Sequence, residues 1–157
     1  MKTLTQADII STVGEEVILS NVTNLEILFL SFEEIASLHC LPNLEKLSFI
    51  DNGIKTISNL DPVSLKLRSL TICDQQITSI DSGAFNLPHL VDLHLHRNQI
   101  TFITGFSGCP RLRKLWIFQN KIKDLKGFQD IPHLEELWIQ ADWMNTTHQL
   151  SMIPPRA

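Results

Sequence analysis

The sequence predicts a solenoid, a stack of coils that each begin with a short β-strand. Three observations predict this fold class. Leucine-led segments return at nearly constant intervals, apolar residues recur at fixed positions within each segment, and a side-chain amide returns at one further position. Repeat periods of roughly 20 to 50 residues are typical of solenoids, because one repeat can bury its apolar side chains only against its neighbours.

Five segments align on a leucine that we number position 1. This leucine is Leu44, Leu67, Leu90, Leu112 or Leu134, which gives steps of 23, 23, 22 and 22 residues. An earlier copy aligns from Leu25, only 19 residues before the next one. Within each copy the apolar residues occupy positions 1, 4, 6, 11 and 14, which in the fourth copy are Leu90, Leu93, Leu95, Ile100 and Ile103.

The spacing of these positions predicts how each coil is built. Alternate residues of a strand point to opposite faces, so positions 4 and 6 face the core while positions 3, 5 and 7 face solvent. Positions 11 and 14 follow a turn and reach the core from the return path. Position 9 carries a side-chain amide in four copies, at Asn52, Gln75, Asn98 and Asn120. We expect these amides to bond unpaired backbone groups of the turn.

The two ends of the stack need covers, because an open coil exposes core leucines to water. At the front, Thr5 and Asp8 form a capping pattern before an apolar helical stripe. We therefore expect an N-terminal helical cap at residues 1–24. At the rear, Leu150 continues the register of Phe128 on the return path, and no C-terminal cap is evident. Six repeats are thus expected in residues 25–157, starting near residues 25, 44, 67, 90, 112 and 134.

The pattern resembles the leucine-rich repeat family, L-x-x-L-x-L-x-x-N-x-I, and its 22-residue spacing is similar to the SDS22-like subclass. The resemblance implies an α/β fold: a right-handed, curved solenoid with a parallel sheet on the concave side and irregular or 3-10 segments on the convex side. Members of the subclass act by binding other proteins, so the resemblance implies a scaffold without naming its ligand. The segment "DSGAFNLPHL" at residues 81–90 departs from this pattern, because it is similar to longer extracellular repeats.

Composition and motifs argue against several classes of function. The net charge of −4 provides no overall positive field for nucleic acid or an anionic membrane surface. Three cysteines, an odd number without C-x-x-C spacing, argue against a disulfide framework and favour a reducing compartment. Glycine-rich phosphate loops, nucleophile elbows and H-E-x-x-H motifs are absent from the sequence. We therefore expect a protein that is not an enzyme and needs no cofactor.

The candidate binding residues face outward from the strands of the fourth to sixth copies. They are Asp92, His94, His96, Lys114, Trp116, Phe118, Glu136 and Trp138. Large aromatic side chains in outward positions favour a contact surface, although a cross-strand pair that covers the sheet near its end is the alternative. A zinc site at Cys73, His94 and His96 is a weaker alternative, and the expected metal content is none. A second apolar patch, Ile27, Phe29 and Phe32, is expected on the first coil.

These observations favour a cytoplasmic adaptor whose concave face grips a helix or an extended segment of another protein. The cilium and the nucleus are compatible intracellular locations. A secreted recognition protein that binds glycans or microbial surfaces is the alternative, for which glycosylation at Asn21 or Asn145 would be evidence. The sequence does not indicate an oligomeric state.

Overall fold

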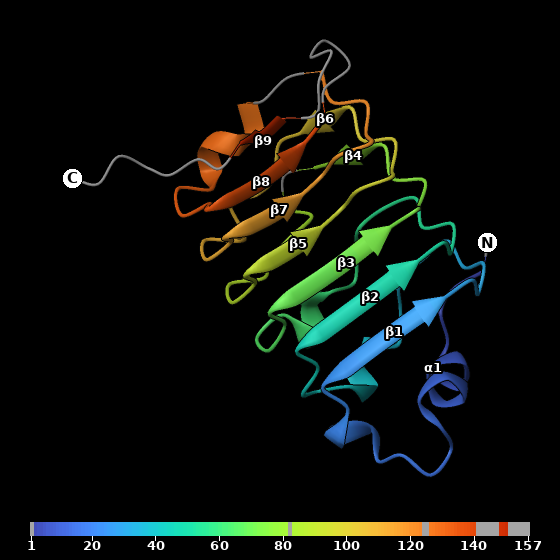
Figure 1. Cartoon of the computed structure of the whole chain (residues 1–157). Coiled ribbons are helices and arrows are strands. Elements are labelled where there is room, and N and C mark those ends of the chain that lie inside the picture. The colour runs from blue at the N-terminus through green and yellow to red at the C-terminus, as the bar shows by residue number, and fades with distance from the viewer. Residues whose placement is uncertain (1, 82, 124–125, 141–147, 151–157) are drawn as a thin grey trace.

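The computed structural model describes residues 2–81, 83–123, 126–140 and 148–150 of the 157-residue chain. Seven strands form one sheet in the order β1-β2-β3-β5-β7-β8-β9 (Figure 1). Their bounds are Asn24–Leu28, Lys46–Ile50, Ser69–Cys73, Asp92–His94, Lys114–Trp116, Glu136–Ile139 and His148–Leu150. Each strand from β1 to β8 is parallel to its neighbour, so the chain makes one coil between successive strands. The predicted parallel-sheet solenoid is confirmed.

The core is a set of apolar rows that run along the stack. The position 4 residues of β2 to β8 lie directly opposite one another in the sheet, and each is at most 4% exposed. They are Leu47, Leu70, Leu93, Leu115 and Leu137. Position 6 supplies a second buried row, from Phe49 to Ile139. Because burying each such side chain contributes about 1.5–3 kcal/mol, the stack is stabilised by contacts between coils rather than within one coil.

The predicted alignment of the first coil is wrong by three residues. Leu25 pairs with Leu47, a position 4 residue, so position 1 of the first coil is Val22. Ile27 is fully buried and Leu28 is 40% exposed, the reverse of the predicted orientation. Strand side chains alternate between the two faces of a sheet, so a shift of one or three residues turns every one of them to the opposite face. Only the frame that starts at Val22 places the side chain of Ile27 in the core. The step to the next coil is thus 22 residues, like the other steps.

The rear of the sheet also differs from the prediction. β9 runs antiparallel to β8, with Leu150 opposite Leu137, so Leu150 does not continue the return-path register of Phe128. An unpaired edge strand leaves a row of backbone N–H and C=O groups without partners. β9 provides such partners along β8. The sequence also offers Trp143 and Met144 as side chains that could shield the last coil, but both lie outside the described residues.

A capped helix covers the front of the stack. Helix α1 (Gln6–Val13) begins at Thr5, whose hydroxyl accepts a hydrogen bond from the Asp8 backbone N–H. The Asp8 carboxylate in turn accepts from the Thr5 backbone N–H at 2.9 Å, so the predicted capping box is confirmed. Ile9 is fully buried, and α1 lies at the β1 end of the molecule (Figure 1). The division into a cap at residues 1–24 and six repeats stays a prediction.

The return paths between the main strands contain short elements. Four are 3-10 helices: η1 (Leu19–Asn21), η2 (Leu38–Cys40), η3 (Asp61–Val63) and η4 (Lys126–Asp130). Two are strands, β4 (Ser79–Ile80) and β6 (Phe102–Ile103), which pair in parallel behind the main sheet (Figure 1). Among the described residues, no helix has the length and apolar character needed to cross a bilayer.

Each of the first five coils turns sharply at position 8, soon after its strand. The residues there have φ between 52° and 58°, in the left-handed region, although none of them is glycine. They are Phe29, Asp51, Asp74, Arg97 and Gln119. This shared conformation also supports the corrected frame, since Phe29 occupies position 8 only if the first coil starts at Val22. The turn directs the chain away from the sheet and toward the buried amide of position 9.

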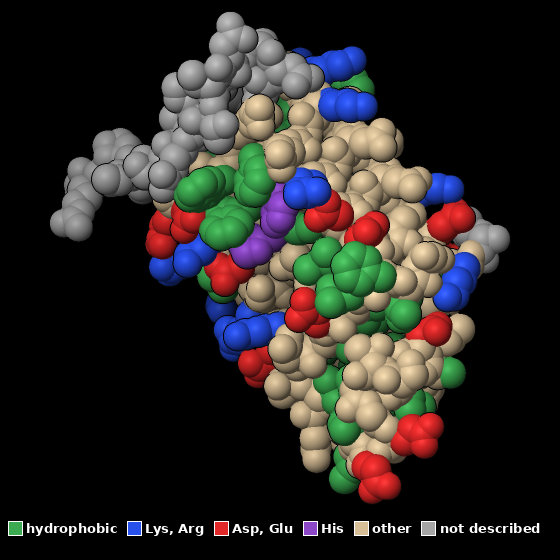
Figure 2. Space-filling view, turned by 45° about the vertical axis from the view of Figure 1, so that its right-hand side comes forward, with side chains coloured by type: hydrophobic (Ala, Val, Ile, Leu, Met, Phe, Trp, Pro, Cys, Tyr) green, Lys and Arg blue, Asp and Glu red, His purple; other side chains and the backbone are tan. Residues whose placement is uncertain are grey.

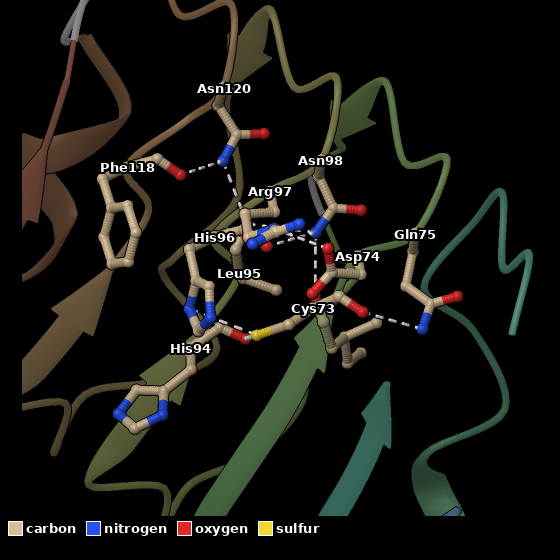
Figure 3. Close-up of polar contacts among 11 residues, drawn as sticks. Cys73, Asp74, Gln75, His94, Leu95, His96, Arg97, Asn98, Phe118 and Asn120 are labelled. Atoms are coloured by element: carbon tan, nitrogen blue, oxygen red, sulfur yellow. Dashed lines mark hydrogen bonds and ion pairs between the residues drawn. The ribbon is translucent and has the colours of Figure 1, made fainter. Parts of the chain in front are cut away.

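The buried amides bond the turn backbone as predicted. Gln75 Oε1 accepts from the backbone N–H groups of residues 52–54 at 2.8–3.1 Å, and its Nε2 donates to the Cys73 carbonyl at 2.9 Å. Asn120 Nδ2 donates to the carbonyl oxygens of Leu95 and Ile117, both at 2.9 Å. Gln75, Asn98 and Asn120 follow one another from coil to coil (Figure 3). These bonds hold each strand end in a fixed position, including those that carry the candidate site.

Candidate functional site

The eight predicted partner-binding residues share the solvent-facing side of the main sheet, which we call the sheet face. Cross-strand register aligns them in rows, with His94 opposite Trp116 and Trp116 opposite Trp138. Asp92, Lys114 and Glu136 form a parallel row two residues earlier in each coil. His96 and Phe118 follow directly after β5 and β7. Lys114 is exposed, and the other seven side chains are partly buried.

Five of these side chains form a stacked group, His94, His96, Trp116, Phe118 and Trp138, which we call the aromatic cluster. The ring centroids of His94 and Trp116 are 4.3 Å apart with 12° between the ring planes. His96 and Phe118 stack at 4.7 Å and 5°, and Trp116 and Trp138 lie tilted at 5.6 Å. Figure 2 shows histidines packed beside hydrophobic side chains on the molecular surface. Such cross-strand aromatic pairs contribute about 0.5–1.5 kcal/mol each beyond their burial.

Glu136 holds both indole rings of the cluster. Its Oε1 accepts hydrogen bonds from Nε1 of Trp116 and from Nε1 of Trp138, both at 2.8 Å. An ionised acceptor strengthens a hydrogen bond relative to a neutral one. One carboxylate oxygen therefore fixes the orientation of two tryptophans on adjacent strands.

Asp92 is the one described residue with a buried side-chain oxygen that lacks a hydrogen-bond partner. The oxygen is Oδ1. Lys114 occupies the same row on the next strand, but no ion pair joins the two among the described residues. A buried acceptor without a donor costs about 1–3 kcal/mol. Asp92 therefore has unused capacity to accept a hydrogen bond at the border of the aromatic cluster.

Burial decides the protonation state of the two histidines. It lowers the pKa of His94 below its usual 6.5, an effect that the charges of Asp92 and Glu136 partly oppose. Burial likewise lowers the pKa of His96, and the neighbouring His94 adds to the effect. Both imidazoles are consequently neutral at pH 7, which suits their stacking against the rings of Trp116 and Phe118.

Cys73, at the end of β3, and His96, just after β5, approach each other closely. Cys73 Sγ lies 3.2 Å from His96 Nδ1 (Figure 3). Burial raises the pKa of Cys73 to about 12, so in the metal-free protein the side chain is a thiol at neutral pH. Within the described part of the chain, no three His, Cys, Asp or Glu side chains converge on one point. The zinc alternative has no support from this geometry.

The first coil contributes a different set of residues from the predicted apolar patch. Ile27 and Phe32 belong to the core, whereas Phe29 is 67% exposed at the left-handed turn. Leu28, which the sequence frame assigned to the core, is 40% exposed and lies on the sheet face. The 22-residue step from Val22 to Leu44 is the sequence signal that assigns Leu28 and Phe29 to the surface. The exposed pair is far along the sheet from the aromatic cluster, with β2 and β3 between them.

Comparison with known proteins supports the repeat assignment. Residues 66–122, which cover the third and fourth coils and the first half of the fifth, match the family model described as Leucine rich repeat. A human protein named Leucine-rich repeats and immunoglobulin-like domains protein 1 is 33% identical over 91 residues, covering 54% of this chain and 8% of that protein. A solved internalin (inlF) from Listeria monocytogenes matches with a TM-score of 0.60 and 26% identity, covering 78% of this chain and 38% of that one.

The chain spans less than half the length of both relatives, so their whole activities do not transfer to it. Leucine-rich repeat proteins generally mediate protein–protein interaction and are typically non-enzymatic scaffolds. Neither match supports the SDS22-like subclass. The family model, the register of six parallel strands and the internalin structure together support the identification of this chain as a leucine-rich repeat protein.

Proposed function

We propose that the protein is a scaffold that binds another protein through the aromatic cluster on the sheet face. The observation that carries this proposal is the position of two tryptophans, a phenylalanine and two histidines, all partly exposed, on one side of the sheet. Tryptophans dominate binding energy at protein interfaces because they bury large areas in a rigid shape. A helix or an extended segment of the partner would lie across β5, β7 and β8.

The rigidity of the cluster supports the proposal. Stacking against His94 and the shared bond to Glu136 already fix the ring of Trp116 before any partner arrives. Immobilising a side chain on binding costs about 0.5–1.5 kcal/mol. A surface whose rings are already ordered avoids much of this cost and retains more of the burial energy as affinity.

The free oxygen of Asp92 supports the same location. A partner N–H or O–H that reaches Oδ1 would satisfy an acceptor that is buried without a donor among the described residues. A hydrogen bond to this oxygen would contribute more binding free energy than one to an acceptor that water already solvates. Asp92 therefore offers one directional contact beside a mostly apolar surface, a combination typical of binding sites.

Removal of the two indoles tests the proposal. The Trp116→Ala/Trp138→Ala double variant should lose at least 100-fold in affinity for partners, while its thermal unfolding stays cooperative because neither residue belongs to the leucine rows. Phe102→Ala is a matched control, since Phe102 is an aromatic side chain 52% exposed on β6 behind the sheet. Proteins captured from cells by wild type but not by the double variant would be purified, and their affinity measured by calorimetry. Equal affinity of the double variant and wild type would refute the proposal.

We also propose a cytoplasmic location and the SDS22-like subclass. The three cysteines are free thiols, two of them buried, which suits a reducing compartment. The steps of the corrected frame, which are 22, 23, 23, 22 and 22 residues, support the subclass. Glycosylation of the exposed Asn21 in protein from native cells, seen as a mass shift removed by a glycosidase, would overturn this location in favour of the secreted alternative.

A further inference from the structure

A basic hollow lies beside the sheet face, where successive strands begin. It is lined by Arg68, His89, Val91, Arg111, Arg113 and His133, and we call it the arginine hollow. Its volume is about 410 Å³. The residues come from three successive coils, the third to the fifth, and the beginnings of β3, β5, β7 and β8 lie side by side along one edge of the sheet (Figure 1). None of them belongs to the aromatic cluster.

The charge of the hollow is opposite to that of the whole chain. Three guanidinium groups line it, and no carboxylate does, although the chain has a net charge of −4. Glu135 is nearby and forms an ion pair with Arg113 at 2.7 Å. Arg68 forms no ion pair within the described part of the chain. Arg68 and Arg111 therefore have no carboxylate partner among the described residues, and a bound anion would supply the compensating charge.

Two of the arginines are held in place by neighbouring side chains. Arg111 Nη1 lies 3.3 Å from His89 Nδ1, and because arginine can only donate, the imidazole accepts at that nitrogen. Arg113 Nη1 donates to Glu135 Oε1. These contacts use one guanidinium N–H of each arginine and leave other donors of the planar fork for a ligand.

The backbone of the sheet sets the spacing of the charges. Val91 N–H donates to the Arg68 carbonyl at 2.8 Å, and Arg113 N–H donates to the Val91 carbonyl at 2.9 Å. Arg68 and Arg113 therefore flank Val91 on either side, at the same position of successive coils. Neighbouring strands are about 4.8 Å apart, so the two guanidinium groups can approach one small ligand from opposite sides.

We propose that the arginine hollow binds a phosphate group, either free or carried on a phosphorylated side chain of another protein. Arginine forks match the oxygens of phosphate in bidentate pairs. A phosphate monoester has a charge of about −1.5 to −2 at pH 7, which suits a site with three guanidinium groups and no carboxylate in its lining. The hollow is open on one side, so the group that carries the phosphate can remain outside. This site is independent of the proposed role of the aromatic cluster.

Titration with inorganic phosphate tests the site directly. Isothermal calorimetry at pH 7.5 and low ionic strength should show saturable binding at one site per chain. Arg68→Gln and Arg111→Gln should each weaken the affinity about tenfold. Arg97→Gln is the matched control, because Arg97 is an equally exposed arginine that pairs with Asp74 at the other end of the strands, and it should change the affinity less than twofold. Circular dichroism would verify that all three variants fold.

Peptides then distinguish the two sources of the phosphate. A phosphoserine peptide should bind at least tenfold more tightly than the same peptide with serine or glutamate if a phosphorylated protein is the ligand, whereas binding of inorganic phosphate alone supports a free ion. Two results would overturn the proposal. One is the absence of saturable phosphate binding to wild type. The other is an equal loss of affinity in the Arg97→Gln control, which would indicate attraction by the general field of the protein rather than a site.

Discussion

Substitution of Asn98 tests the most demanding claim about the fold, that buried amides hold the coil turns. Asn98 is 7% exposed and joins two coils. Its Oδ1 accepts from the Ile77 backbone N–H at 3.3 Å. Its Nδ2 donates to the carbonyl oxygens of Ile72 and Leu95 at 2.8 and 3.0 Å. In Asn98→Ala the Ile77 N–H and the Ile72 carbonyl lose this partner, whereas the Leu95 carbonyl still accepts from Asn120 Nδ2 at 2.9 Å.

The expected loss of stability follows from the number of groups left without a partner. Each buried and unsatisfied polar group costs about 1–3 kcal/mol, so two of them give a loss of at least about 2 kcal/mol. Asn98→Asp separates hydrogen bonding from volume, because it keeps the size of the side chain and one acceptor but places a second oxygen against two carbonyl oxygens. At pH 7 we expect Asn98→Asp to be at least as destabilising as Asn98→Ala.

Urea unfolding followed by tryptophan fluorescence measures these changes as shifts of the midpoint at constant slope. Gln99→Ala is the matched control, since Gln99 is the exposed neighbour and only its backbone N–H takes part in the turn. It should change the free energy of unfolding by less than about 0.5 kcal/mol. A loss below about 1 kcal/mol for Asn98→Ala, or one no larger than that of Gln99→Ala, would show that the amide row does not stabilise the turns.

Three further predictions concern packing, backbone conformation and pH. Gly108→Ala should destabilise the protein by about 3 kcal/mol or more, seen as a lower melting temperature, because its Cβ would lie only 1.7 Å from the Phe85 carbonyl oxygen. Gln119→Gly should not reduce the free energy of unfolding in urea, since its φ of 53° strains any L side chain by about 1–2 kcal/mol; a clear loss would contradict this. The pKa values of His94 and His96 are lower in the folded protein than in the unfolded chain, so the unfolded chain binds protons at a higher pH. The free energy of unfolding should therefore fall as the pH drops below 6.5. The fall should be less steep in the His94→Gln/His96→Gln variant.

The repeat pattern predicted the coils because each apolar position has one physical role. Leu93 and Leu95 are both fully buried, which requires the residues between and beside them to face solvent. That alternation in the sequence is sufficient to place His94 and Trp116 on one face of the sheet. The stacking angles and the shared bond of Glu136 could not be predicted, because rotamers depend on all the neighbours of a side chain rather than on its row.

The two ends of the chain show where such patterns fail. The stretch "LEILFL" satisfies the leucine spacing in one frame by coincidence, whereas the structure uses the frame of Val22. The repeat length from coil to coil identifies the correct frame better than the residue pattern within one coil, because backbone hydrogen bonds between neighbouring strands fix the number of residues in a coil. At the rear, the antiparallel pairing of β9 depends on an edge that exists only once the sheet has formed. No local periodicity encodes it.

Register connects the sequence of this protein to its surface chemistry. When parallel coils stack in constant register, residues at the same position form a row whose members are about 4.8 Å apart. This spacing is within the range of about 4.5–7 Å between the ring centroids of interacting aromatic side chains. Row 5 reads Thr71, His94, Trp116 and Trp138, so its aromatic members must meet as neighbours. Inserting one residue before β7 would keep every amino acid but turn Trp116 toward the core. Such an insertion should abolish partner binding and unfold the stack together. Trp116→Ala should abolish binding at a modest loss of stability, about 0.5–1.5 kcal/mol for each of its two aromatic pairs. If Trp116→Ala destabilises the fold as much as the insertion does, the cluster stabilises the sheet and is not a binding surface.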